Sequence, residues 1–228
     1  MKVLITGITG MVGSHLADYI LNNHPDAEVS GVVRWRSPLD NIRQRLDDIT
    51  LIQGELRDLS SMIQVINQVQ PDRIFHLAAQ SFVPISYESP GDTFTVNVIG
   101  SINLLDAVRN VGIDPIIHMC SSAEVYGNVD ESMVPITENT PFNPASPYAV
   151  SKVGQDMLGS QYHISYGMKI IRTRMFTHSG PRRGNFFAES AFAKQIAEIE
   201  LGVIPGPVMV GNLESIRTYA DVRDAVRA

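Results

Sequence analysis

The chain has 228 residues, 44% hydrophobic and 18% charged, which suffices for one large α/β domain, or for one domain and the start of a second. Its net charge of −6 argues against a nucleic-acid partner, and no apolar run approaches the roughly 20 residues that cross a membrane. A lone cysteine, Cys120, excludes an internal disulfide and, with a glycine as early as Gly7 breaking any signal-peptide pattern, predicts a cytoplasmic protein.

Short runs rich in valine and isoleucine alternate with longer helical patterns along the chain. The runs lack the in/out alternation of a half-exposed strand, so they predict strands covered on both faces, as in a parallel sheet. We expect an α/β fold with a doubly wound parallel sheet of the Rossmann type. The predicted strands are 2–6, 28–33, 49–53, 73–77, 115–119 and 169–173, and the predicted helices are 12–21, 59–69, 93–110, 149–166 and 189–201.

Two further stretches bear on the domain organisation. Residues 127–147 are rich in proline and polar side chains, which predicts a long irregular loop of the kind that is usually functional. Residues 221–228 read as the opening of a helix, so we expect the complete protein to continue beyond them. We therefore predict a nucleotide-binding domain over residues 1–175 and the start of a truncated substrate-binding domain over residues 176–228.

The first predicted strand runs into the sequence TGITGMVG, a G-x-x-G-x-x-G loop that opens a helix. The first glycine of such a loop makes the tight turn, the second lets the backbone approach a pyrophosphate, and the third allows close helix–strand packing. The pyrophosphate then lies at the helix N-terminus, where free N–H groups favour an anion. Three glycines alone are weak evidence, but their position predicts a dinucleotide site made by Gly7, Thr9, Gly10, Met11, Val12 and Gly13.

The second strand ends in Arg34 and Arg36, where an NAD-specific site usually places an aspartate or glutamate. Arginines suit the 2′-phosphate of NADP through charge-assisted hydrogen bonds, so we expect NADP rather than NAD. The alternative is a pair of solvated surface arginines, and it is stronger for Arg36 than for Arg34.

The third and fourth strands supply further cofactor candidates. Asp58 is expected to cap the next helix and to accept a hydrogen bond from the adenine amino group, beside Leu59. Small residues at the end of the fourth strand would let the cofactor lie against the sheet at its switch point. His76 is interpreted as a structural core residue. The candidates at this strand end are Leu77, Ala78, Ala79 and Gln80.

Tyr148 and Lys152 are the main catalytic candidates. Their spacing of four places them on one helix face, and a nearby ammonium together with a positive nicotinamide ring lowers the pKa of a phenol. Tyr148 could then act as a base near neutral pH. Ser122 and Glu124 follow the fifth strand, where Ser122 could bond a sugar hydroxyl and Glu124 could remove a proton from carbon. Taken singly, they would read as a turn serine and a solvated charge.

Together these residues resemble the extended short-chain dehydrogenases/reductases, and more finely the GDP-mannose 4,6-dehydratase family, over the whole chain. The segments that carry the resemblance are LAAQSFV (77–83), SPYAVSK (146–152), SYGM (165–168) and FTHSGPRRG (176–184). The resemblance implies a nucleotide-sugar substrate, a homo-oligomer, and no metal. It also implies that His178 and Arg183 help hold the cofactor, that Ser81 contacts the substrate and that Arg217 binds its diphosphate.

The implied reaction converts GDP-mannose to GDP-4-keto-6-deoxymannose by moving a hydride from C4 to C6. Two positions depart from the family pattern: Ala123 stands where the dehydratases usually carry serine or aspartate, and Thr177 stands where many members carry asparagine. Ser122 followed by Ala123 resembles the 4-epimerases, which lack the glutamate at 124. A 4-epimerase, a 4-keto-sugar reductase and a non-catalytic NADP-binding module therefore stay open as alternatives.

Overall fold

A six-stranded parallel sheet runs through the centre of the computed structural model, which describes residues 1–214 and 216–228. The strand order is β3-β2-β1-β4-β5-β6, so the direction of winding reverses between β1 and β4 and the predicted doubly wound sheet is confirmed. Each strand lies within one residue of its predicted position. The strands are β1 (Lys2–Thr6), β2 (Glu28–Val33), β3 (Ile49–Gln53), β4 (Arg73–His76), β5 (Ile116–Cys120) and β6 (Lys169–Thr173).

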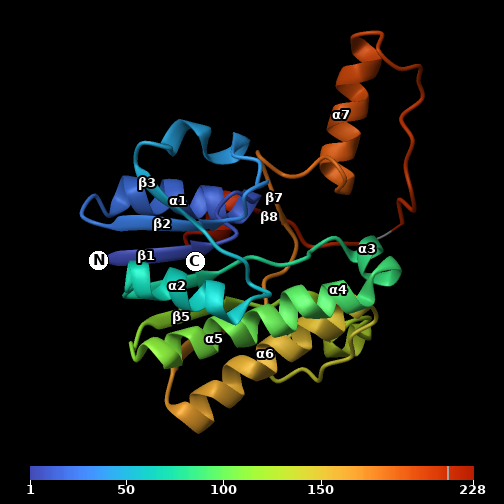
Figure 1. The fold of residues 1–228 in the computed structure, drawn as a ribbon. Helices are drawn as coiled ribbons and strands as arrows, with labels where there is room; N and C mark the ends of the chain where they lie inside the picture. Colours follow the sequence, from blue (N-terminus) through green and yellow to red (C-terminus); the bar gives the residue numbers. More distant parts are fainter. Residues whose placement is uncertain (215) are drawn as a thin grey trace.

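Helices cover both faces of the sheet, as Figure 1 shows. On one face α1 (Met11–Asn23) packs over β1 and β2 around a cluster that includes Ile5, Leu16 and Ile20. On the other face lie α2 (Leu59–Val69), α5 (Gly100–Val111) and α6 (Pro147–Tyr166), around a cluster that includes Ile66 and Leu104. Because both faces are buried at the centre, the strands carry the continuous apolar runs that the sequence shows.

The segment before α5 differs from the prediction. The single helix expected over 93–110 is instead α4 (Pro90–Phe94), a π-helical turn η2 (Thr95–Ile99) and then α5. A short helix that the sequence did not indicate, α3 (Val83–Glu88), precedes them. Residues 127–147 form the expected irregular loop, interrupted by the 3₁₀ turn η4 (Glu131–Met133) and preceded by the 3₁₀ turns η1 (Asp40–Arg45) and η3 (Ala123–Tyr126).

The last fifty residues make few buried contacts. Helix α7 (Ala188–Glu200) has no fully buried residue and stands apart from the sheet in Figure 1. The chain then returns, and β8 (Ala220–Asp221) pairs with β7 (His178–Ser179) before the short helix α8 (Val222–Ala225). Val222 is fully buried, and the returning segment contacts α1. No helix among residues 1–214 and 216–228 is both long and apolar enough to cross a membrane.

Candidate functional site

The predicted site residues gather at the carboxyl ends of β1, β4 and β5, next to the reversal of strand order. In open α/β sheets ligands bind in the crevice outside these strand ends. The glycine loop follows β1, residues 77–80 follow β4, Ser122 and Glu124 follow β5, and Tyr148 lies in the first turn of α6. The fold therefore brings together segments that are far apart in the sequence.

The glycine loop has the geometry that its sequence predicts. Gly7 has φ +76°, and a Cβ there would lie 2.8 Å from the backbone nitrogen of Ala78. A Cβ at Gly13 would lie 2.3 Å from the carbonyl oxygen of Gly7, so the helix can approach the strand only without a side chain. Gly10 is the N-cap residue of α1, and no side chain caps that helix. The N–H groups of Met11 and Val12 bond no other described residue, which suits an anionic pyrophosphate.

Asn41, which the sequence did not single out, ties the glycine loop to a distant segment. Its Nδ2 donates to the carbonyl oxygens of Thr9 at 2.9 Å and Arg182 at 3.3 Å. Arg182 also pairs with Asp18 of α1 at 2.7 Å. Arg182 thus lies beside the loop, and it is the neighbour in sequence of Arg183, to which the resemblance assigns a cofactor contact.

The candidates for the adenosine end of a cofactor lie on the surface. Arg34 and Arg36 are both exposed, and the Arg36 guanidinium lies 4.2 Å from the ring centroid of Trp35, which is 76% exposed. Asp58 caps α2 as predicted, since its carboxylate accepts a hydrogen bond from the N–H of Ser61 at 2.8 Å.

The segment after β4 is held by Asn97, a second residue that the sequence analysis missed. Asn97 is fully buried in the π-helical turn, accepts from the N–H of Gln80, and donates to the carbonyl of Gln80 and to the hydroxyl of Ser151. The Gln80 side chain itself donates to Thr93 and accepts from the N–H of Phe82. Gln80 is therefore fixed by the protein, while Ser81 is exposed at the rim of the crevice.

Helix α6 places the proposed catalytic pair in the interior. Ser146 caps this helix by accepting from the N–H of Ala149, and Pro147 occupies its first position. Tyr148 is 8% exposed and Lys152 3% exposed, with the Lys152 nitrogen 5.9 Å from the centroid of the Tyr148 ring. The ammonium donates to the carbonyl oxygen of Cys120 at 2.8 Å and to Oε1 of Gln155 at 2.7 Å.

The protein's own groups hold the pKa of Tyr148 above its ordinary value. Burial of the phenol is the main cause, a hydrogen bond with the Ser122 hydroxyl opposes it, and the carboxylate of Glu124 adds to the rise. Burial also lowers the pKa of Lys152. Ser122 also accepts a hydrogen bond from the N–H of Glu124, whose carboxylate is exposed to the crevice.

Of the residues that the resemblance assigns to cofactor or diphosphate, two are bonded within the protein and one is exposed to solvent. His178 donates from Nδ1 to the carbonyl of Phe176, and Arg183 donates to the carbonyl of His178. The Arg183 guanidinium also lies 2.9 Å from a carboxylate oxygen of Glu189, so its charge is already balanced by a neighbour. Arg217 is exposed in the coil before β8 and makes no hydrogen bond or ion pair with another described residue.

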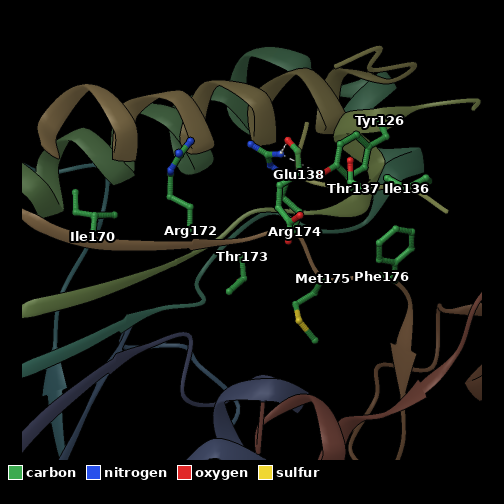
Figure 2. Close-up of a pocket in the computed structure, with 10 residues that line it drawn as sticks. All are labelled: Tyr126, Ile136, Thr137, Glu138, Ile170, Arg172, Thr173, Arg174, Met175 and Phe176. Atoms are coloured by element: carbon green, nitrogen blue, oxygen red, sulfur yellow. Dashed lines mark hydrogen bonds between the residues drawn. The ribbon is translucent and has the colours of Figure 1, made fainter. Parts of the chain in front are cut away.

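A cavity of about 480 Å³ lies beside β6 rather than at the strand ends. Figure 2 shows Arg172 and Arg174 on its wall, on the side of α6, where both guanidinium groups pair with the fully buried Asp156. Arg174 also donates to the Tyr126 hydroxyl and to the carbonyl of Glu138, and so anchors the irregular loop. None of the predicted catalytic side chains lines this cavity.

No group of three or more histidine, cysteine, aspartate or glutamate side chains is arranged to hold a metal ion among the described residues.

Comparison with known proteins adds the family context. A family model described as GDP-mannose 4,6 dehydratase matches residues 4–228. The GDP-mannose 4,6-dehydratase of Yersinia enterocolitica is 38% identical to the chain, and that of Homo sapiens is 33% identical. Each alignment covers 99% of this chain but 62% of the relative, so the chain spans less than two thirds of their length.

Solved structures show the same fold. RMD from Pseudomonas aeruginosa, complexed with NADPH, superposes with a TM-score of 0.81 at 29% identity, covering 99% of this chain and 71% of that one. The UDP-glucose 4-epimerase of Thermus thermophilus, complexed with NAD, gives a TM-score of 0.85 at 30% identity, covering 100% of this chain and 72% of that one.

Proposed function

The chain belongs to the GDP-mannose 4,6-dehydratase family of extended short-chain dehydrogenases/reductases, and from that premise we propose that the complete protein is an NADP-dependent 4,6-dehydratase acting on GDP-mannose in the cytoplasm. The observation that carries the proposal is the convergence of Ser122, Glu124 and Tyr148 at the end of β5. A hydroxyl, a carboxylate and a phenol are the groups that oxidation at one sugar carbon and proton removal at the next require.

The residues present fit a dinucleotide cofactor. The Gly7 and Gly13 positions exclude any side chain, and the unpartnered N–H groups at the start of α1 suit its pyrophosphate. Arg34 and Arg36 would hold the 2′-phosphate of NADP, Asp58 the adenine, and residues 77–80 the remainder through their backbone. The NADPH found in RMD supports NADP, whereas the NAD found in the epimerase shows that the fold accepts both cofactors.

When bound, NADP⁺ would supply the acceptor for the C4 hydride and the donor that delivers it to C6. In this mechanism Ser122 orients the C4 hydroxyl and Tyr148, as phenolate, takes its proton. Because burial raises the pKa of Tyr148, the lowering that makes it a base is assigned to the positive nicotinamide ring together with the ammonium of Lys152. Glu124 then removes the C5 proton, which the new ketone has made acidic, and passes it to the C6 hydroxyl, which leaves as water. When the hydride is delivered to C6, C5 takes up a proton that comes from solvent.

We propose the domain division at residues 175 and 176 on the same reasoning. Residues 1–175 contain the whole parallel sheet with Tyr148 and Lys152, and residues 176–228 begin the substrate-binding part. In the complete protein we propose cofactor contacts for His178 and Arg183. We propose substrate contacts for Ser81 and Arg217. Arg183 would contact the cofactor only while sharing its charge with Glu189.

Substitution of Glu124 in the full-length protein tests the dehydratase proposal. Glu124→Gln should leave the first hydride transfer intact, because that step needs only Ser122, Tyr148 and Lys152. Loss of a general base costs about 10²- to 10⁴-fold in rate, so reduced nicotinamide should accumulate together with a 4-keto sugar. Deuterium from solvent should enter C5 with the wild type and not with Glu124→Gln. Tyr148→Phe, the control, should suppress even the first reduction. Full turnover by Glu124→Gln would contradict the proposal.

A 4-epimerase is the second candidate, and Ala123 is the observation that favours it. The side chain at 123 offers no proton donor beside Glu124, and an epimerase needs neither group because it returns the hydride to C4. Incubation of the full-length protein with GDP-mannose and with UDP-glucose separates the two. A 4-keto-6-deoxy product supports the dehydratase, and a C4 epimer supports the epimerase.

A further inference from the structure

The ammonium of Lys152 is held at two points by the protein. Its three N–H donors include one that bonds the carbonyl oxygen of Cys120, at the end of β5, and one that bonds Oε1 of Gln155, one turn further along α6. Only one N–H is left for a ligand or for the Tyr148 phenol. Gln155 is fully buried, and nothing in the reaction proposed above uses it.

The hydrogen-bond directions around Gln155 are fixed by its neighbours. The single hydroxyl proton of Ser101 goes to the carbonyl of Asn97 at 2.6 Å, so the Ser101 oxygen must accept from Nε2 of Gln155 at 2.9 Å. The same oxygen accepts from Nε2 of His76 at 3.0 Å, which leaves Nδ1 of His76 to accept from the Thr6 hydroxyl at 2.8 Å. With its amide nitrogen committed to Ser101, Gln155 can present only its oxygen to Lys152.

We propose that Gln155 is a positioning residue that keeps the buried Lys152 in its ammonium form and directs its remaining N–H toward the Tyr148 end of the crevice. A neutral acceptor 2.7 Å from the nitrogen stabilises the positive charge without cancelling it. A carboxylate at that place would cancel the field that favours the phenolate. The anchoring stands on this chain's contacts alone, whereas its kinetic consequence rests on the proposed function.

Among the titratable groups around Lys152, the Cys120 thiol favours the ammonium but does not offset the effect of burial, and the others do not supply this stabilisation. Tyr148 and Asp156 lie on the same helix as Lys152, but the carboxylate of Asp156 forms ion pairs with Arg172 and Arg174. From the sheet come the Cys120 thiol and two histidines, His76 and His118, and Glu124 faces the crevice from η3. Both histidines are held neutral by burial, which lowers their pKa to about 3 for His76 and about 4 for His118.

The direct test is the pKa of Lys152 in the full-length protein, measured from its side-chain nitrogen resonance and assigned with Lys152→Arg. Gln155→Met keeps a straight side chain but removes the acceptor, so the pKa of Lys152 should fall by about one to two units. Ser101→Ala, which frees the amide to rotate, should shift it less in the same direction. Gln161→Met is the matched control, because Gln161 is an exposed amide on the same helix. In Gln161→Met the pKa of Lys152 should equal that of the wild type.

The kinetic test follows the first hydride transfer to NADP⁺ as a function of pH. Since Lys152 would lose its proton at lower pH in Gln155→Met, the alkaline limb of the rate profile should move down by the same one to two units, with the Kd for NADPH within twofold of the wild type. A Lys152 pKa within about 0.3 units of the wild type in both Gln155→Met and Ser101→Ala overturns the positioning role, even if the melting temperature falls. Absence of NADP⁺ reduction by the wild type would refute the proposed function and leave the resonance test valid.

Discussion

The fully buried His76 should make the stability of the fold depend on pH between 7 and 5. Its imidazole is enclosed between Thr6 and Ser101, and burial lowers its pKa from 6.5 to about 3. The unfolded chain therefore binds a proton below pH 6.5 that the folded chain does not bind, so stability is full above that pH and is lost as the pH falls toward 3. From pH 7 to pH 5 the loss amounts to about 2 kcal/mol for this one group.

Urea unfolding at pH 7, 6 and 5, followed by circular dichroism, measures this loss. The variant His76→Asn removes the titration, so its free energy of unfolding should fall by about 2 kcal/mol less over the same interval, whatever its stability at pH 7. Burial lowers the pKa of His118 to about 4, so His118 also makes the free energy of unfolding fall as the pH falls. The variant His118→Asn measures its share of the loss. Carboxyl groups with lowered pKa values, such as Asp221, titrate below this window. Equal losses in wild type and His76→Asn would refute the reasoning.

Three further predictions concern the loop, a buried ion pair and the cofactor. By urea unfolding, Gly13→Ala should cost about 2–3 kcal/mol of stability because its Cβ would meet a carbonyl oxygen at 2.3 Å. Gly10→Ala, with its nearest atom at 3.2 Å, should cost under about 1 kcal/mol yet weaken NADPH at least tenfold by calorimetry. Asp156→Asn should destabilise the fold by about 3 kcal/mol, because Arg172 and Arg174 lose a buried counter-charge; an unchanged urea midpoint would contradict this. Arg34→Ala should weaken NADPH about tenfold and leave NADH unaffected, and equal affinities of the wild type for both would exclude the 2′-phosphate role.

The sheet could be predicted from the sequence because each strand is recognised from a short run of neighbouring residues. Strands buried on both faces must be apolar at successive positions, and apolar runs located all six within one residue. The expectation that every strand is covered on both faces was wrong for β6, which lies at the edge of the sheet and has Ile171 55% exposed. The cap at Asp58 and the glycine loop were likewise predictable, since each depends on a few neighbouring residues. The π-helical turn at Thr95–Ile99 was not, because its five residues, TVNVI, include no proline or glycine that would mark a change of helix type.

The polar contacts behind Tyr148 and Lys152 could not be predicted for a different reason. Asn97 and Ser101 lie four residues apart on one segment, and Lys152 and Gln155 three apart on another, which are spacings that also fit two solvated helix faces. The hydrogen-bond partners are determined only when the fold brings α5 and α6 together. Gln155 and Ser101, which bond each other, are 54 positions apart in the sequence. The available signal was weak: amide and hydroxyl side chains within otherwise apolar stripes, which a buried network requires and a solvated face does not.

The same network bears on the proposed catalytic pair, Tyr148 and Lys152. A Tyr–Lys spacing of four says that two side chains share a helix face, but not that either is ionised as the reaction needs. In this fold burial works against both, raising the pKa of Tyr148 and lowering that of Lys152. Stabilisation of the ammonium must therefore come from acceptors beyond the motif, and the structure provides two, the Cys120 carbonyl and the Gln155 amide. Hydrogen bonds connect Gln155 through Ser101 and His76 to Thr6, which lies at the start of the glycine loop. The position of the Lys152 ammonium therefore depends on the same strand end that is proposed to bind the cofactor.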